Sequence, residues 1–357
     1  MPDYTLMDHA DAMITRLDRT DRVGVDTEFM REKTFFAELC LVQISTGDGY
    51  YCVDPLNGDD MGNFWDSLMR PTWVLHSGRQ DIEVIYQTAR KLPGSLFDTQ
   101  IAAGLLGYAP QMGYATLVSE LFEVDIPKSH TRADWSKRPL SDAYLEYAAE
   151  DVEYLLPAYD VLAEKLDRQN RLAWAEEDSA TLLNPALYDA DPFLAIDRLK
   201  GARNLRGTRR AAAARLAAWR ENEALRANRP RQWIVKDSAI LELAATLPSS
   251  SNELEDIEGV PPGLIRRAGK SILAAIDAAQ SDDSDDAPPQ PPSESQKALL
   301  KAMQKRVADC ADNLGLAAET VASKRDLSAI IFGGDRESKV LSGWRRELVG
   351  EDLLELL

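Results

Sequence analysis

Residues 23–29 read Val-Gly-Val-Asp-Thr-Glu-Phe, an apolar, strand-like run that carries two carboxylates, Asp26 and Glu28, two positions apart. Successive side chains of a strand point to opposite faces, so the two acids project to the same side. Burial and mutual repulsion oppose such a pair unless a cation balances it, and hard divalent ions prefer carboxylate oxygen. For this pair alone, a strand end whose acids face water is at least as good an explanation.

Three later segments favour the metal-site interpretation. Tyr147 and Asp151 lie four residues apart in a helical pattern and therefore share one helix face, although a core Tyr beside a solvated Asp has the same spacing. Asp81 falls in the first turn of a helix predicted to follow Gly78, where the helix dipole also favours an acid. Asp98 is predicted to cap a further helix.

The ordered set matches the acidic signature of the DEDDy 3′–5′ exonucleases: Asp26-x-Glu28, then Asp81, then Tyr147-x-x-x-Asp151. The surrounding sequence resembles bacterial ribonuclease D more specifically, over residues 97–103, 129–140, 147–157 and 341–348. A short Asp-x-Glu motif is weak evidence, whereas the ordered set with its flanking residues is strong. The resemblance covers nearly the whole chain.

This resemblance implies an α/β ribonuclease H-like exonuclease domain, in which a mixed sheet is flanked by helices, followed by all-α HRDC-type helical domains. The local patterns agree with an antiparallel start followed by alternating helices. Strands are predicted over Arg22–Glu28, Leu39–Ser45, Tyr50–Asp54 and Thr72–Leu75, with a hairpin at Thr46–Gly49. Helices are predicted over Asp81–Arg90, Gln100–Leu106, Thr116–Phe122 and Asp142–Leu166.

The resemblance, together with the local composition, divides the chain into four parts. The resemblance implies that residues 1–195 form the exonuclease domain, and residues 203–280 resemble an HRDC domain, in which Trp219, Trp233 and Ile234 are expected to be core residues. Residues 281–295 are rich in Asp, Ser and Pro and are expected to be a flexible linker. Residues 296–357 are expected to form a second, HRDC-like helical domain.

The resemblance also implies the chemistry of the site. Asp26, Glu28, Asp81 and Asp151 would hold two divalent cations, Mg²⁺ or Mn²⁺, which stabilise the attacking and leaving oxygens of an in-line phosphodiester hydrolysis. Tyr147 would orient the attacking water, since a phenol with a pKa near 10 is a poor base at neutral pH.

Further residues are candidates for substrate contacts. Phe29, Met30 and His76 neighbour the acids and suit the terminal nucleotide, although ordinary core positions explain them equally well. A basic loop before the Tyr147 helix suits phosphate contacts, although half of it has the composition of plain surface: Lys128, Arg132, Lys137 and Arg138. Asp134 and Trp135 are expected to hold that loop in place.

The net charge of −18 argues against a nucleic-acid partner until its distribution is considered. Residues 198–236, here called the basic stripe, hold twelve Arg or Lys and two Glu, a local net charge of +10. Screening limits a charge's reach to roughly 8 Å, so the stripe can bind phosphate in spite of the acidic remainder. Its densest part consists of Arg203, Arg206, Arg209 and Arg210. The alternative is a solvated helix face.

Three cysteines, Cys40, Cys52 and Cys310, form neither a disulfide framework nor a metal-ligand spacing, which suits a reducing cytosol. Neither a signal peptide nor an apolar run long enough to span a bilayer is evident. We therefore expect a cytoplasmic protein that acts as a monomer without a membrane partner.

The function predicted from the resemblance is a 3′–5′ exoribonuclease that releases nucleoside 5′-monophosphates from RNA with a free 3′ end, such as tRNA precursors. Two alternatives remain open. One is a DNA-directed 3′–5′ exonuclease with the same chemistry, and the other is a non-catalytic binding protein that acts through its HRDC domains. Sugar discrimination depends on contacts to the 2′-OH, which the sequence does not locate.

Overall fold

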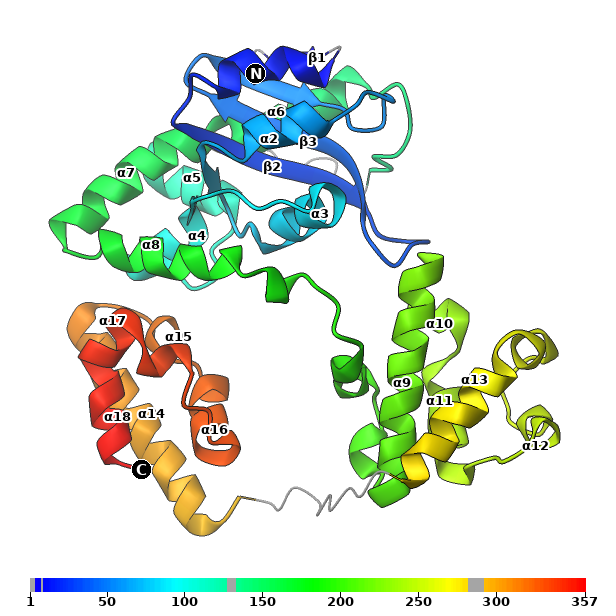
Figure 1. Ribbon diagram of the computed structural model, residues 1–357. Coiled ribbons are helices and arrows are strands. Elements are labelled where there is room, and N and C mark those ends of the chain that lie inside the picture. The colour runs from blue at the N-terminus through cyan, green and yellow to red at the C-terminus, as the bar shows by residue number, and fades with distance from the viewer. Residues whose placement is uncertain (1–3, 8, 127–132, 282–291) are drawn as a thin grey trace. The chain divides into compact units, whose positions relative to one another are not determined.

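The structure is a computed structural model that describes residues 4–7, 9–126, 133–281 and 292–357. The chain forms two compact units (Figure 1). The first unit contains the N-terminal segment up to Met30, then Leu39–Tyr188, and finally Pro292–Leu357. The second contains Arg31–Glu38 and the residues that follow Tyr188 up to the predicted linker.

A six-stranded mixed sheet forms the centre of the first unit, with the strand order β1-β4-β3-β2-β5-β6. Strands β3 and β4 are antiparallel, whereas β1 pairs with β4, β2 with β5, and β5 with β6 in parallel. The strands are β1 (Tyr4–Met7), β2 (Arg22–Met30), β3 (Glu38–Thr46), β4 (Gly49–Val53), β5 (Thr72–Leu75) and β6 (Leu96–Asp98). The four predicted strands and the hairpin are confirmed, as is the mixed α/β fold.

Two edge strands were not predicted. Strand β1 has four residues and β6 has three, which is too short for an alternating pattern to show in the sequence. Both are fixed by pairing with longer neighbours, Tyr4 with Tyr50 and Leu96 with Trp73.

Helices flank the sheet in the first unit: α1 (Ile14–Leu17), α2 (Gly62–Leu68), α3 (Arg79–Ala89), α4 (Thr99–Leu105), α5 (Tyr114–Phe122), α6 (Asp142–Glu153), α7 (Leu155–Arg168) and α8 (Leu172–Ala180). The predicted cap at Asp98 is confirmed, because its buried carboxylate accepts from the N–H groups of Gln100 and Ile101. The same carboxylate accepts from Ser77 and Gly78, and so joins the start of α3 to β6.

The single helix predicted over Asp142–Leu166 is wrong in one respect. It breaks at Tyr154 into α6 and α7. Pro157 explains the break, because a proline has no N–H to bond the carbonyl four residues earlier. Beside the break, Val152 of α6 and Leu155 of α7 are buried against Val74 of β5.

The second unit is helical, with α9 (Gly207–Ala227), α10 (Arg231–Ile234), α11 (Asp237–Thr246), α12 (Ser251–Glu255) and α13 (Pro262–Gln280) around one apolar core. The placement of Trp233 in that core is wrong, since 61% of its surface is exposed. Val235 is the buried residue of this segment, Ile234 is half-buried, and Trp219 packs against the core.

The boundary of the second unit lies earlier than predicted. Leu199 and Ala202 are buried in its core, and the short helix Pro192–Arg198 packs on α9. The predicted limits at 195 and 203 therefore fall inside a segment that packs with the helical unit. The excursion Arg31–Glu38 also belongs to this unit, because the N–H groups of Phe35 and Phe36 both donate to Asn228 Oδ1 at 3.1 Å.

The last helices have a core of their own: α14 (Glu294–Leu314), α15 (Ala318–Val321), α16 (Lys324–Gly333), α17 (Gly343–Arg345) and α18 (Glu351–Glu355). Helix α14 begins at Glu294, two residues before the predicted domain start, because Ser293 and Gln296 form a capping box there. Residues 282–291 of the predicted linker lie outside the described residues.

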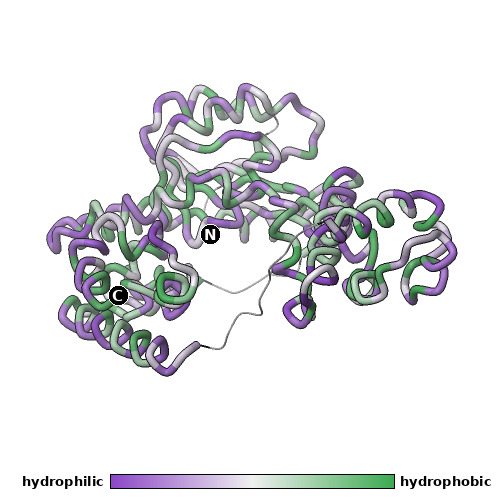
Figure 2. Tube along the Cα trace, turned by 60° about the horizontal axis from the view of Figure 1, so that its bottom comes forward, coloured by the Kyte–Doolittle hydropathy of each residue, from purple (hydrophilic) through white to green (hydrophobic). Residues whose placement is uncertain are grey.

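These helices pack against the nuclease part of the first unit. The indole of Trp344 stacks on that of Trp174 in α8, with centroids 4.6 Å apart and planes 8° apart. Beside it, the buried Arg345 guanidinium forms a bidentate ion pair with Asp178. Hydrophobic and hydrophilic residues are interspersed along the helices (Figure 2). In the described part of the chain, none of the helices has the length and apolar character needed to cross a membrane.

Candidate active site

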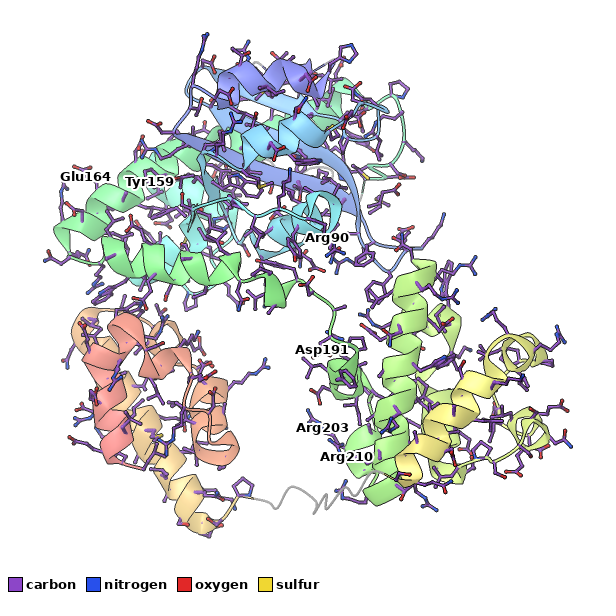
Figure 3. The ribbon with its side chains drawn as sticks, in the orientation of Figure 1. Arg90, Tyr159, Glu164, Asp191, Arg203 and Arg210 are labelled. Atoms are coloured by element: carbon purple, nitrogen blue, oxygen red, sulfur yellow. The ribbon has the colours of Figure 1, made fainter. Side chains whose placement is uncertain are left out.

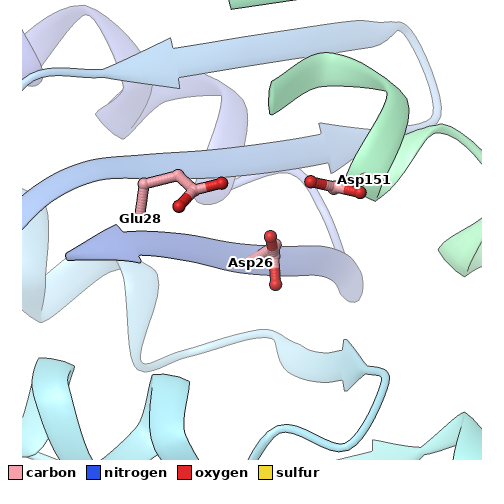
Figure 4. A group of neighbouring side chains, drawn as sticks. All are labelled: Asp26, Glu28 and Asp151. Carbon is pink, nitrogen blue, oxygen red and sulfur yellow. The ribbon is translucent and has the colours of Figure 1, made fainter. Parts of the chain in front are cut away.

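Three carboxylates meet where β2 lies beside α6 (Figure 4). Asp26 and Glu28 project from the same face of β2, as their spacing predicts, and Asp151 projects from α6. One oxygen from each lies within 4.8 Å of the other two. This is the separation expected of ligands around one cation, since carboxylate oxygens lie about 2.0–2.6 Å from a bound Mg²⁺ or Ca²⁺.

The electrostatics of this cluster favour either protonation of the acids or a bound cation. Burial, together with the neighbouring acids, raises the pKa of Asp26 well above its ordinary value. Burial is also the largest cause that raises the pKa of Glu28 to about 8 and that of Asp151 to about 7. Without a cation these groups hold protons near neutrality, whereas a divalent ion favours their charged forms. The three oxygen ligands therefore fit a divalent cation.

Asp81, the fourth predicted ligand, stands beside this group of three. It is 92% buried in the first turn of α3, and Thr27 Oγ1 of β2 donates to its Oδ1 at 2.5 Å. Burial raises the pKa of Asp81 to about 6. After burial itself, the charge of Asp81 is the largest cause of the raised pKa of Asp26, so the two carboxylates are electrostatic neighbours.

Tyr147 lies one helical turn before Asp151, as predicted, and packs against the buried Trp135 ring with centroids 6.2 Å apart. Burial, and then the charge of Asp151, raise the pKa of the Tyr147 phenol. Its hydroxyl is hydrogen-bonded to the Asp151 carboxylate and stabilises the charged form of that acid. The phenol is therefore protonated at neutral pH and acts as a hydrogen-bond donor.

A cavity of about 170 Å³ opens over the acids, here called the active-site cavity. Asp26, Glu28, Tyr147 and Asp151 line it together with three other side chains, His76, Tyr114 and Leu155. The sequence predicted His76 but neither Tyr114 nor Leu155. Both lie at the first residue of a helix, and their local sequence is that of ordinary amphipathic helices.

His76 is held by both ring nitrogens. Its Nε2 lies 2.8 Å from the carbonyl oxygen of Met112, and its Nδ1 lies 2.9 Å from Thr99 Oγ1. Burial lowers the pKa of this imidazole, so it is neutral at pH 7. The ring lies 5.7 Å from that of Tyr114, measured between centroids, so the two form one aromatic wall of the cavity.

Tyr114 ties the cavity to the break between α6 and α7. Its hydroxyl accepts from the N–H of Tyr154 at 2.9 Å and donates to the carbonyl of Glu150 at 3.3 Å. The two bonds reach backbone groups on either side of Asp151, one and three residues away, so Tyr114 fixes the end of the helix that carries this acid. Burial raises the pKa of the Tyr114 phenol.

Phe29 and Met30 do not line the active-site cavity. Both are half-buried, and Met30 packs against the apolar cluster around Cys52 and Trp135. Their predicted contact with the terminal nucleotide stays a prediction.

The basic loop before α6 is only partly described, since Lys128 and Arg132 lie outside the described residues. Arg138, a predicted phosphate contact, forms an ion pair with Asp54 and donates to the carbonyl of Cys40. Its guanidinium therefore anchors the loop. Lys137 is exposed, with its Nζ 3.7 Å from Asp134. Trp135 is buried, and the expectation that Asp134 and Trp135 hold the loop in place stays a prediction.

Several cations of the basic stripe are paired with acids. Glu221, fully buried in α9, pairs with Arg231 and lies 3.5 Å from Arg198, and the buried Arg220 pairs with Asp237. The four predicted RNA contacts precede or begin α9 (Figure 3 labels two of them): Arg203, Arg206, Arg209 and Arg210. Arg203, Arg206 and Arg209 are exposed.

Comparisons with known proteins agree with this geometry. A family model described as 3′–5′ exonuclease matches residues 5–167, and a model of the HRDC domain matches residues 209–276. Ribonuclease D of Granulibacter bethesdensis is 38% identical over 97% of this chain and 89% of its own length. Ribonuclease D of Acidiphilium cryptum is 39% identical over 99% of this chain and 93% of its own length.

The crystal structure of Escherichia coli RNase D, described as an exoribonuclease involved in structured RNA processing, has the same fold. It aligns with a TM-score of 0.88 and 28% identity, over 99% of this chain and 98% of that one.

Proposed function

The chain belongs to the ribonuclease D family of 3′–5′ exoribonucleases, and from this premise we propose that it trims the 3′ ends of structured RNAs, tRNA precursors among them. The products are nucleoside 5′-monophosphates, released one at a time. The observation that carries the proposal is the group of three carboxylates within 4.8 Å on the floor of the active-site cavity.

The acids of the cavity would hold two Mg²⁺ or Mn²⁺ ions, with Asp81 completing the set that Asp26, Glu28 and Asp151 begin. Bound divalent ions stabilise charge on phosphate oxygens and lower the pKa of a coordinated water. We propose that the protein acts as a monomer, with all four acids of a site on one chain.

Tyr147 would orient the attacking water by donating a hydrogen bond. The raised pKa of its phenol argues against proton abstraction by the phenolate at neutral pH. The neutral His76 and the Tyr114 ring offer an aromatic wall for the terminal base or sugar, and Leu155 offers an apolar contact. These side chains exclude water on one side of the scissile bond.

Matched RNA and DNA oligomers test the proposal. With Mg²⁺ or Mn²⁺, 5′-labelled single-stranded RNA should shorten in single-nucleotide steps, and 3′-labelled RNA should release its label first as a nucleoside 5′-monophosphate. EDTA should stop both reactions. Faster degradation of the DNA oligomer would transfer the activity to DNA, and binding without any degradation would leave only a nucleic-acid-binding protein.

A further inference from the structure

A second, larger cavity of about 880 Å³ lies within the first unit, where the last helices of the chain pack against the nuclease helices. We call it the junction cavity. One wall comes from α4 and the turn that follows it, with Gln100 and Gln111. The other wall comes from α15, the start of α16, and Lys339. The volume is within the range of roughly 300–1,000 Å³ that is usual for ligand sites.

The cations of the junction cavity are not all neutralised. Arg345 is buried and paired with Asp178, and Lys339 lies 3.9 Å from Asp326. Lys324 and Arg325 are exposed, and in the described part of the chain neither of them forms an ion pair. The remaining acid of the lining is Glu319, so the free cations outnumber it.

The walls that carry these two cations are fixed. A capping box between Ser323 and Asp326 sets the start of α16, which places Lys324 and Arg325 in its first turn. The Arg345 guanidinium donates to the carbonyls of Thr320 and Val321 at 3.0 and 2.9 Å, and so ties α15 to the ion pair with Asp178. The junction cavity is therefore preorganised by a buried charged network.

The junction cavity adjoins the active-site cavity. His76 lines the active-site cavity, and Gln100 lines the junction cavity. Both side chains contact the same carbonyl oxygen, that of Met112. It lies 2.8 Å from His76 Nε2 and accepts a hydrogen bond from Gln100 Nε2 at 2.9 Å. One peptide carbonyl thus separates the two linings.

From these contacts we propose that the junction cavity binds the phosphodiester backbone of the RNA upstream of the nucleotide being removed. The inference rests on the proposed function and adds a second contact region to it. Lys324 and Arg325 pair with phosphates, while the amides of Gln100 and Gln111 supply donors to phosphate or sugar oxygens. Such contacts read no bases, which suits an enzyme that removes one nucleotide after another.

The test is a double variant, Lys324→Ala with Arg325→Ala, compared with a matched control, Lys301→Ala with Lys305→Ala. The control residues are exposed cations of α14 that do not line the junction cavity. Binding of labelled single-stranded RNA is measured by fluorescence anisotropy in EDTA, over a length series from dinucleotides upwards. KM and kcat are measured on the same RNAs with Mg²⁺.

We expect the double variant to bind long RNAs roughly tenfold more weakly and to flatten the slope of log K against log salt by about 1.4, the value for two lost phosphate contacts on a single strand. KM should rise to match, while kcat at saturation and the affinity for dinucleotides stay unchanged. The control should behave as wild type at every length.

Equal affinity and salt slope in wild type and double variant, on RNAs that wild type trims, would overturn the inference and leave the proposed function intact. Failure of the proposed function would give a different result. If wild type binds but does not trim RNA, and the double variant still loses affinity only for long RNAs, the proposed function is wrong and the junction cavity is a binding site.

Discussion

Asp26, Glu28 and Asp151 each carry a carboxylate that burial makes costly to ionise. Burial raises the pKa of Glu28 from 4.5 to about 8 and the pKa of Asp151 from 3.8 to about 7. Without metal, the folded protein holds protons at these sites that the unfolded chain releases. The stability of the metal-free protein therefore falls as pH rises from the unfolded pKa to the folded one.

We therefore predict that the pH dependence of the protein's thermal stability has opposite signs with and without bound metal. In EDTA, the melting temperature should decrease between about pH 5 and pH 8, and Glu28→Gln should make that decrease smaller. With saturating Mg²⁺ the stabilisation should instead grow over the same interval, because the ion binds the deprotonated acids. Calorimetry at several pH values measures both. A stabilisation by Mg²⁺ as large at pH 5 as at pH 8 would show that these acids do not hold the ion.

The hydroxyl of Tyr147 provides a second residue-scale prediction. Tyr147→Phe removes the donor and leaves all four carboxylates, so metal and RNA should still bind while turnover falls by about 10²-fold. Tyr144→Phe is the matched control, because Tyr144 lies on the same helix and packs against Trp135 outside the active-site cavity. Single-turnover rates should separate the two variants. Near-normal turnover in Tyr147→Phe would mean that another group positions the water.

Residue spacing predicted most of the carboxylate cluster and the neighbouring Tyr147. The i, i+2 rule places Asp26 and Glu28 on one face of β2, and the i, i+4 rule places Tyr147 and Asp151 on one face of α6. Tyr114 and Leu155 could not be found this way, since tertiary packing alone brings the first residues of α5 and α7 to the acids. The ion pair of Arg138 could not be predicted either, because its partner Asp54 lies 84 residues earlier in the chain.

Among the elements, α8 and α17 form the contact that joins the last helices to the nuclease part. Arg345→Ala would leave the half-buried Asp178 without its bidentate cation, with the Trp344 indole N–H still donating to it, and should destabilise the first unit by about 3–5 kcal/mol. The neighbouring Arg346 pairs with Glu351 on the surface, so Arg346→Ala should cost less than about 1 kcal/mol. Thermal or urea unfolding distinguishes the two variants, and equal losses would refute a stabilising role for the buried pair.

At this scale, long periodic elements were predicted and local exceptions were not. The strands of the central hairpin and helices α3 to α5 repeat their apolar residues often enough to be recognised. The break at Tyr154 was missed because the apolar helical pattern continues across it, and only Pro157 indicates that the helix is interrupted. The exposure of Trp233 depends on α10 being a single turn, in which Val235 is the residue that reaches the core.

For the whole molecule, the order of segments along the chain does not show which segments belong to the same unit. The last residues of the chain join the nuclease part in the first unit, and Arg31–Glu38, which directly follows the catalytic strand, joins the HRDC unit. Both depend on contacts between residues more than a hundred positions apart, such as Trp174 with Trp344 and Phe35 with Asn228. No local pattern in the sequence encodes these pairs.

The basic stripe yields a prediction at this scale. Neutralising Arg203, Arg206, Arg209 and Arg210 should flatten the slope of log K against log salt by roughly 0.7 for each lost phosphate contact. Long or structured RNAs should lose more affinity than short ones, and single-turnover cleavage of a short, saturating RNA should stay unchanged.

Substitution of Arg266, Arg267 and Lys270, exposed cations of α13 outside the stripe, is the control. An unchanged salt slope for a tRNA precursor would favour the alternative that the stripe is a solvated helix face.

The central claim is that the carboxylate cluster on β2 and α6 is a metal-dependent exonuclease centre, and Asp26→Asn tests it most directly. The variant, wild type and Asp21→Asn, an exposed acid just before β2, are compared on linear and circular 5′-labelled RNA with Mg²⁺ or Mn²⁺. Wild type and Asp21→Asn should shorten only the linear RNA, stepwise from its 3′ end, whereas Asp26→Asn should be folded, inactive and unable to bind the ion tightly. Turnover by Asp26→Asn, or cleavage of the circular RNA by wild type, would contradict the account.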